Sequence, residues 1–105
     1  MNKVFLSGVV SEAPRLMQQD GKRNHAEFKL AISHRLAEGS WKKEFYTIHS
    51  WNNLAVWVAQ NIGSGQLVSI EGYLTRRADI EVTAREVIAG VQAKARTAEV
   101  QSECG

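Results

Sequence analysis

Few of the residues that mark disulfide-rich, secreted or membrane-bound proteins occur in this sequence. Cys104 is the single cysteine among 105 residues, so no internal disulfide framework can form, and we expect an intracellular protein. The first apolar run, "VFLSGVV", is short and holds a serine and a glycine, which excludes a signal-peptide core or a membrane span there. The net charge is only +2 at pH 7, which permits a polyanionic partner without requiring one.

Motifs for catalysis and for metal binding are also missing. The sequence contains no phosphate loop of the type G-x-x-x-x-G-K-[ST], no H-E-x-x-H, and no serine or cysteine with plausible catalytic partners. His25, His34 and His49 lack metal-ligand spacing and have no cysteine or carboxylate cluster beside them. We therefore predict a protein that is not an enzyme and that holds no cofactor and no metal ion.

What the sequence does contain is a regular alternation of apolar and polar residues, which is typical of half-buried β-strands. A length of 105 residues allows one domain with a single core. The alternation predicts five strands, over residues 2–10, 26–33, 44–51, 66–77 and 78–88. The side chains expected to face the core are Val4, Leu6, Phe28, Leu30, Ile32, Ile48, Val68, Ile70, Leu74, Ile80, Val82 and Ala84.

One helix is predicted, in the stretch "NNLAVWVAQNIG". Leu54, Val58 and Ile62 recur at the spacing of one helix face, and Gly63 can end the helix. Either of the two asparagines that open the stretch can cap its N-terminus. Trp57 lies beside the apolar stripe, so we expect this side chain in the core.

Turn signals and charged stretches separate these elements. The pair "DG" at residues 20–21 indicates a hairpin turn, and Pro14 belongs at an edge or a bend. Residues 34–43 form a second, charged connection that carries Trp41. The connection between the last two strands, around residues 77–79, is very short.

The predicted order is three strands, one helix and two strands. Five strands with a helix between the third and the fourth make the all-β OB-fold, a partly open Greek-key barrel. The alternation stops after Gly90, so we predict this domain over residues 1–90 and a weakly structured or disordered tail over 91–105. In this fold the surface around the second and third strands, with two neighbouring loops, binds oligonucleotides and oligosaccharides.

The strand "EFYTIHSW" places two large aromatic side chains where water is expected. If Ile48 faces the core, Phe45 and Trp51 lie on the opposite face together with Thr47 and His49. Binding a single strand without sequence preference requires cations along the phosphates and aromatic rings on which bases stack. Each stack contributes roughly 1–3 kcal/mol, so the rings would supply most of the affinity and the cations its salt dependence.

Basic residues collect near these rings, at loops and strand ends. The candidate residues for contacts with single-stranded nucleic acid are Trp51, Phe45, Trp41, Lys42, Lys43, Arg35, Lys22, Arg23, Arg76, Arg77, His49 and Lys3. Plain solvent exposure is the alternative for several of them. Paired lysines most often form a solvated surface, and His49 could stack, contact a phosphate or simply face water.

Exposed aromatic residues on a strand also suit a subunit interface, where Trp and Tyr are enriched. The two interpretations are equally open for Phe45 and Trp51, whereas the basic loop favours stacking for Trp41. We predict a closed symmetric oligomer, because a domain with a small core would otherwise leave polar strand edges exposed. The predicted interface residues are Tyr46, Ser69, Glu71 and Tyr73.

Four stretches resemble the bacterial single-stranded DNA-binding proteins (the SSB family): "MNKVFLSGVV", "AEFKLAIS", "EFYTIHSWNNLA" and "GSGQLVSIEGYLTRR". The resemblance covers about residues 1–90. It implies an OB-fold that oligomerises, as a tetramer or a dimer, and binds single-stranded DNA without sequence preference in replication, recombination or repair. It also implies a cytoplasmic, nucleoid-associated protein with no membrane partner. The stacking positions of the family carry over onto Phe45 and Trp51, and Trp41 can substitute for a loop tryptophan of the family.

Two departures from that family point to a relative. The long hairpin of the family between the fourth and fifth strands, with another stacking tryptophan, is reduced here to a few residues near "RRAD". The acidic, aromatic-ended tail tip of the family has no match in "EVQSECG". Both features resemble primosomal replication protein N, a dimeric relative, as do "LSGVVSEAP" and "NHAEFKL". The alternative function is therefore an OB-fold adaptor in replication restart that docks replication or primosome proteins as well as single-stranded DNA.

Overall fold

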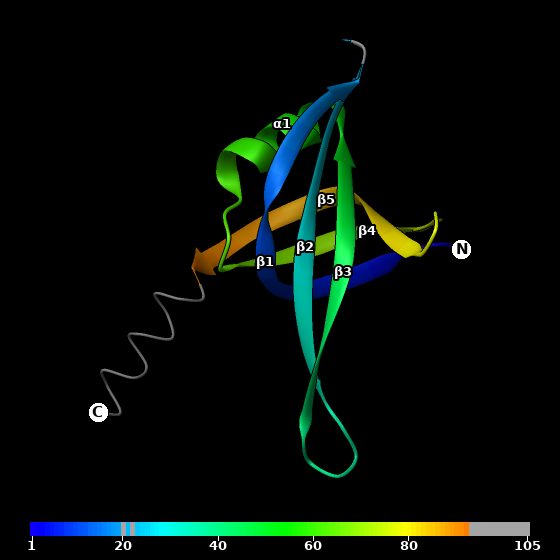
Figure 1. Cartoon of the computed structure of the whole chain (residues 1–105), viewed down its shortest axis with the longest axis vertical. Helices are drawn as coiled ribbons and strands as arrows, with labels where there is room; N and C mark the ends of the chain where they lie inside the picture. The colour runs from blue at the N-terminus through cyan, green and yellow to red at the C-terminus, as the bar shows by residue number, and fades with distance from the viewer. Residues whose placement is uncertain (20, 22, 93–105) are drawn as a thin grey trace.

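The computed structural model describes residues 1–92 except 20 and 22. In this part of the chain five strands close into a barrel in the order β1-β2-β3-β5-β4 (Figure 1). Three strands, one helix and two strands follow one another in sequence, which confirms the predicted OB-fold. The elements are β1 (Val4–Gln19), β2 (Arg23–Arg35), β3 (Trp41–Trp51), α1 (Asn52–Asn61), β4 (Gln66–Arg76) and β5 (Ile80–Gln92).

β1 is much longer than the predicted strand over residues 2–10. Its first half pairs with β4 and its second half with β2, so one strand belongs to two sides of the barrel. The register of β1 against β2 shifts between Val10 and Glu12 and again between Glu12 and Arg15, where Pro14 lies. A proline donates no backbone hydrogen bond, and a bulge lets the strand bend there and continue. The predicted bend is confirmed, whereas the predicted end of the strand is wrong.

The β2–β3 hairpin extends beyond the barrel (Figure 1). β2 continues to Arg35 and β3 begins at Trp41, so the charged loop predicted over 34–43 is reduced to residues 36–40. Trp41 therefore lies in a strand, where it pairs with Arg35. The predicted turn between β1 and β2 is confirmed, and Gly21 supplies its positive φ of 67°.

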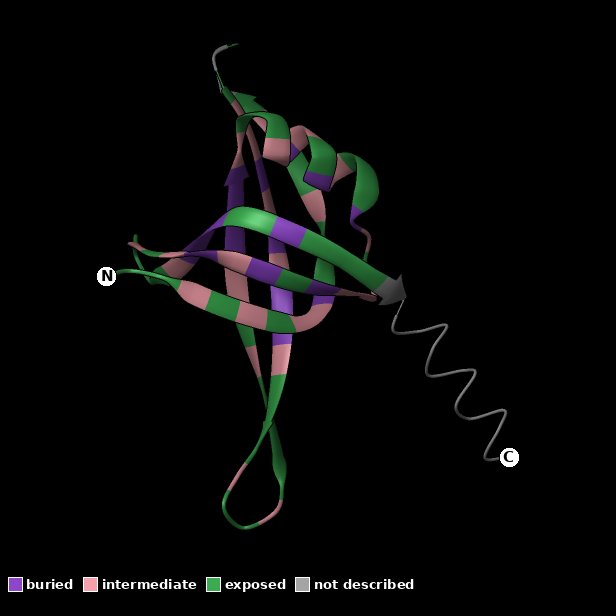
Figure 2. Ribbon diagram, turned by 180° about the vertical axis from the view of Figure 1, so that it is seen from behind, coloured by how far each residue is buried: buried purple, intermediate pink, exposed green. Residues whose placement is uncertain are grey.

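The core fills the barrel and the space beneath α1 (Figure 2). Val4, Leu6 and Ile32, three of the predicted inward residues, are only partly buried and pack against this core. The buried hydrophobic residues that form it are Val10, Ala26, Phe28, Leu30, Ile48, Ala55, Val58, Ile62, Val68, Ile70, Val82, Ala84 and Val87.

Two predicted core residues, Leu74 and Ile80, are exposed instead. They lie on the correct face of their strands but close to the short β4–β5 turn, where Ile80 pairs with Arg76 and nothing in the described part of the chain covers them. At its other end β5 continues to Gln92, two residues beyond the predicted domain boundary. The remainder of the predicted tail, with Cys104, lies outside the described residues.

The helix α1 packs Ala55 and Val58 onto the barrel, and Ile62 follows it into the core. Trp57 is 37% exposed on the flank of this stripe, so its predicted place in the core is wrong. The predicted asparagine cap is also wrong, because Trp51 occupies the cap position and makes no capping hydrogen bond with its side chain. Asn52 instead accepts a hydrogen bond from Arg23 Nε at 3.4 Å. None of the described residues forms a helix long and apolar enough to cross a membrane.

The different burial of Phe28 and Trp57 predicts different losses of stability. Phe28 is 1% exposed, so Phe28→Ala should lower the free energy of unfolding by about 3–5 kcal/mol. Trp57→Ala should cost clearly less, because more than a third of the Trp57 side chain already contacts water. Urea denaturation of both variants measures this order. Equal losses of unfolding free energy in the two variants, or complete unfolding of the Trp57→Ala variant only, would contradict the placement of Trp57.

Candidate nucleic-acid interface

One face of the β2–β3 hairpin carries most of the predicted contact residues. Side chains alternate along a strand, and the register between β2 and β3 is unbroken, so every second residue of each strand lies on this face. We call it the hairpin face. The pairs on it, from the tip of the hairpin to the barrel, are Arg35 with Trp41, Ser33 with Lys43, Ala31 with Phe45, Lys29 with Thr47, Glu27 with His49 and His25 with Trp51.

The outer part of the hairpin face presents open aromatic rings. Trp41 is 67% exposed and Phe45 is 58% exposed. Within the described residues no aromatic ring or cation stacks on either of them. Lys43 lies between them on the same face, and Arg35 lies opposite Trp41. Rings and cations therefore alternate along the outer part of the hairpin.

The inner part of the face is organised differently, because other side chains already cover Trp51. The His25 ring stacks on Trp51 with 4.2 Å between the ring centroids and an interplanar angle of 19°. The guanidinium group of Arg23 lies over the same tryptophan, 4.5 Å from its centroid. Trp51 is thus not the open stacking surface that its position in the sequence suggests.

His49 shares the hairpin face, but its expected exposure to water is wrong. Its side chain is buried, with 3% of the residue exposed, because β5 pairs in parallel with β3 at His49 and Thr83. Its Nε2 atom is hydrogen-bonded to a carboxylate oxygen of Glu81. Its Nδ1 atom lies 2.8 Å from Nε2 of His25. His49 therefore contacts His25 and Glu81 and offers no open ring face on which a base could stack.

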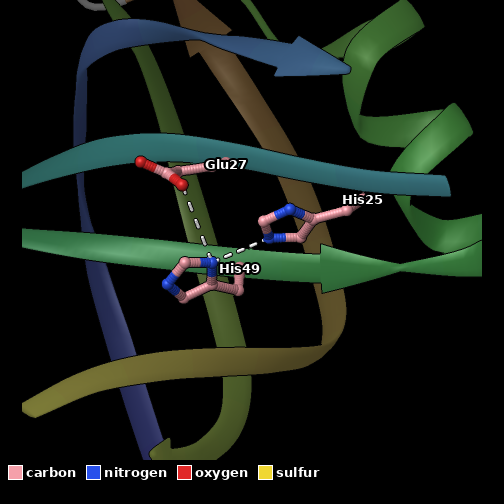
Figure 3. Close-up of side chains that lie close together, drawn as sticks. All are labelled: His25, Glu27 and His49. Atoms are coloured by element: carbon pink, nitrogen blue, oxygen red, sulfur yellow. Dashed lines mark hydrogen bonds and ion pairs between the residues drawn. The ribbon is translucent and has the colours of Figure 1, made fainter. Parts of the chain in front are cut away.

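Figure 3 shows that these histidines lie beside a carboxylate. His25, Glu27 and His49 each offer one potential ligand atom, and these atoms lie within 4.8 Å of one another. The sequence analysis found no carboxylate cluster beside the histidines, whereas the fold brings both Glu27 and Glu81 next to His49. Burial, and next the nearby His49, lower the pKa of His25 from its ordinary value of 6.5. His25 is accordingly mostly neutral at pH 7 and adds little charge to the hairpin face.

The remaining cations are divided among several surfaces. Lys42 faces away from the hairpin face and lies 3.9 Å from Glu44, unlike its neighbour Lys43. Arg77 lies 3.5 Å from the Glu81 carboxylate that also contacts His49, which brings this arginine towards the inner part of the face.

Of the three other predicted cations, Arg76 and Lys3 lie away from the hairpin face. Arg76 is exposed at the end of β4. Lys3 pairs with Glu71 at 3.5 Å on the surface of β1 and β4. Lys22 lies outside the described residues.

Sequence reasoning missed two residues of the hairpin face, Lys29 and His25. The alternation already placed Lys29 outward, but only the register shows that it lies opposite Thr47, next to Phe45 along the face. The stacking of His25 on Trp51 likewise depends on their cross-strand pairing. Neither of these placements can be identified from the sequence of one strand alone.

The predicted interface residues fall into two groups. Ser69, Glu71 and Tyr73 alternate along one face of β4, where the Ser69 hydroxyl bonds that of Ser7 at 2.9 Å and Arg85 lies over the Tyr73 ring. Tyr46 is separate, on β3, where its hydroxyl donates to Glu44 at 3.2 Å. The pocket beside the β4 group is lined by Phe5, Ser7, Ser69, Glu71, Glu86 and Ile88, among others.

Comparison with known proteins gives this geometry a context. An SSB domain from Synechococcus sp. superposes with a TM-score of 0.70 at 23% identity, covering 83% of this chain and 93% of that domain. A mutant of the single-stranded DNA-binding protein from Thermus aquaticus superposes with a TM-score of 0.68 at 17% identity, covering 86% of this chain and 50% of that one. No curated protein sequence matches the chain. The sequence profile of the Single-strand binding protein family matches residues 1–100, and the chain therefore belongs to that family.

Proposed function

We propose that this protein binds single-stranded DNA without strong sequence preference, along the hairpin face. The observation that carries the proposal is the alternation of the two exposed rings, Trp41 and Phe45, with Lys43 on one strand of that face. Rings provide stacking surfaces that every base can use, and the interleaved cations neutralise phosphates between them. Ten strand steps separate Trp41 from Trp51, which is a path of about 33 Å.

The inner part of the face would contribute in a second way. Arg23 lies over Trp51, and such a contact is worth about 0.5–1 kcal/mol at an exposed site. A phosphate can replace the ring as the partner of Arg23 at little cost in free energy. One part of the Trp51 ring would then become accessible to a base. Trp51 thus supports binding only after this exchange, whereas Trp41 and Phe45 are available from the start.

The short β4–β5 turn limits the path of the strand. The turn consists of residues 77–79 and holds no aromatic residue, and Arg77 is already paired with Glu81. Binding therefore concentrates on the hairpin face, and each subunit should occlude a short stretch of DNA.

We infer that this activity serves replication, recombination or repair. The protein would then act in the cytoplasm, in association with the nucleoid. The alternative is an adaptor like primosomal replication protein N, which also binds single-stranded DNA but uses the exposed rings to dock replication or primosome proteins. Quenching of tryptophan fluorescence by oligo(dT) separates the two, because only a base stacked on Trp41 quenches its emission directly.

We also propose that the outer surface of β1, β4 and β5 forms the interface of a symmetric oligomer. Phe5 and Ile88 are large exposed apolar side chains, and both line the pocket beside Ser69 and Glu71. Covering them with a second copy would remove this apolar surface from water. The hairpin face lies on other strands and would remain accessible for DNA.

Substitution of the outer rings should weaken DNA binding most. Trp41→Ala and Phe45→Ala should each reduce the affinity for oligo(dT) by roughly 1–3 kcal/mol. Trp51→Ala should cost less, because His25 and Arg23 already lie against its ring. Fluorescence anisotropy with labelled oligo(dT) measures these affinities. Trp57→Ala is the control, since Trp57 lies on α1, and an equal loss in this variant would refute the assignment.

Two adjacent lysines give a matched test of the electrostatic contribution. Lys43 lies on the hairpin face and Lys42 on the opposite face. Lys43→Gln should therefore make the negative slope of log K against log salt less steep by about 0.7, the value for one phosphate contact. Lys42→Gln should leave the slope nearly unchanged. Titrations at several salt concentrations measure both slopes. Equal slopes in the two variants would show that the charge on this face does not contact phosphate.

The interface proposal predicts a dimer or a larger closed oligomer at micromolar concentration. Ile88→Asp should shift the mass towards the monomer, because the buried face would then carry an unpaired charge. Leu16→Asp is the control, as Leu16 is also an exposed apolar residue but lies in the half of β1 that pairs with β2. Light scattering coupled to size exclusion measures the mass. A monomeric wild-type protein with ordinary stability would be incompatible with the proposal.

A further inference from the structure

We propose that His25, Glu27 and His49 form a binding site for a divalent transition-metal ion, for which Zn²⁺ is the best chemical match. This inference goes beyond the proposed DNA binding and does not depend on it. The three residues are brought together by the β2–β3 register, because Glu27 pairs with His49 and His25 lies two residues from Glu27 on the same face. Their ligand atoms lie within 4.8 Å of one another (Figure 3).

Two of the three distances between ligand atoms are close to those that an ion needs, and the third, between His25 and Glu27, is within 4.8 Å. Two ligand atoms of a tetrahedral Zn²⁺ site, each about 2.0 Å from the ion, lie about 3.3 Å apart. Nε2 of His25 lies 2.8 Å from Nδ1 of His49, and Oε1 of Glu27 lies 3.9 Å from the same Nδ1 atom. One distance must lengthen and the other shorten, each by roughly half an ångström. Small rotations of the His25 and Glu27 side chains, which are only partly buried, can supply this change.

A second and independent observation is the environment of the other nitrogen of His49. Histidine ligands of metal ions usually donate their second ring N–H to a carboxylate, which fixes the tautomer and the orientation of the ring. Nε2 of His49 makes this bond to Glu81, and Arg77 in turn lies 3.5 Å from Glu81. With the proton on Nε2, the lone pair of Nδ1 points towards His25 and Glu27.

The ligand types select the metal. Two imidazole nitrogens and one carboxylate oxygen make the His₂Glu set that binds Zn²⁺ with a fourth position left for water. Ca²⁺ and Mg²⁺ prefer sites made of oxygen atoms only. The Glu27 side chain is 29% exposed, so the site is open to solvent on that side.

The main alternative is a network of hydrogen bonds that needs no ion. Such a network would account for His25, His49 and Glu81, which are linked in series. It leaves Glu27 without a role, because in the described part of the chain its carboxylate makes no hydrogen bond and its closest ion-pair contact is the 3.9 Å approach to His49. An ion would give this carboxylate a partner beside His25 and His49.

Titration with Zn²⁺ alone, without DNA, tests the site. The protein should be untagged, stripped with a chelator and carry Cys104→Ser, so that the single thiol cannot bind the metal. Calorimetry should show one Zn²⁺ per chain with micromolar or tighter affinity, and Co²⁺ should give the visible absorption of a tetrahedral site. Absence of binding in this protein would overturn the proposal.

Two variants and a control locate the ion. Loss of an outer partner of a metal ligand already weakens metal binding about 10–100-fold, so Glu27→Gln and His25→Gln, which remove ligands, should weaken it at least tenfold. Both side chains are partly exposed, so the variants should fold, and circular dichroism verifies this. His49 is buried, so its substitution would also disturb the fold and is not used. His34→Gln is the matched control, because His34 lies on the same strand but pairs with Glu44 at 2.8 Å. Unchanged affinity in Glu27→Gln and His25→Gln would refute the assignment even if Zn²⁺ binds.

Discussion

The register between β2 and β3 is the constraint on which the rest of the site depends. A shift of one residue would move every side chain of a strand to its other face. Phe28 and Ile48 pair across these strands and are almost fully buried, so the core resists such a shift. The outward positions of Trp41, Phe45 and Trp51 are therefore a consequence of what the opposite face buries. The proposed binding surface therefore needs no further interaction to orient its rings.

The same register produces two different surfaces along one hairpin. At the tip, β2 and β3 are the only described strands, and the ring of Trp41 faces water; Phe45 is also exposed, at the point where β1 joins β2. Near the barrel, β5 joins β3 in parallel and brings Glu81 and Thr83 against His49. Side chains there contact one another before they can contact a ligand, as the stacking of His25 on Trp51 shows. The distance from β5 thus determines whether a residue of the hairpin face is available or already occupied.

Local patterns in the sequence were sufficient for the order of the elements and for the faces of most strands, because alternation is a property of neighbouring residues. They failed where a distant segment decides the outcome. Burial of His49 depends on β5, more than thirty residues away in sequence, and the cluster with His25 and Glu27 depends on strand pairing. Continuation of β1 past Pro14 depends on bulges against β2, and exposure of Leu74 depends on where the core ends. Trp57 shows that being beside an apolar stripe differs from being part of it.

The projecting end of the hairpin has a consequence for motion. Beyond Ile32 and before Phe45, the two strands have only each other as hydrogen-bonding partners, and the residues of this segment are largely exposed. A two-stranded ribbon without a packed layer is marginally stable, so its amide hydrogens should exchange with solvent through frequent local opening while those of the barrel remain protected. Trp41, the most exposed ring of the hairpin face, is thus carried by a segment that the barrel does not support. That arrangement lets the ribbon adapt its twist to an irregular strand, and part of the favourable contact energy is then offset by the conformational entropy lost when the ribbon becomes ordered.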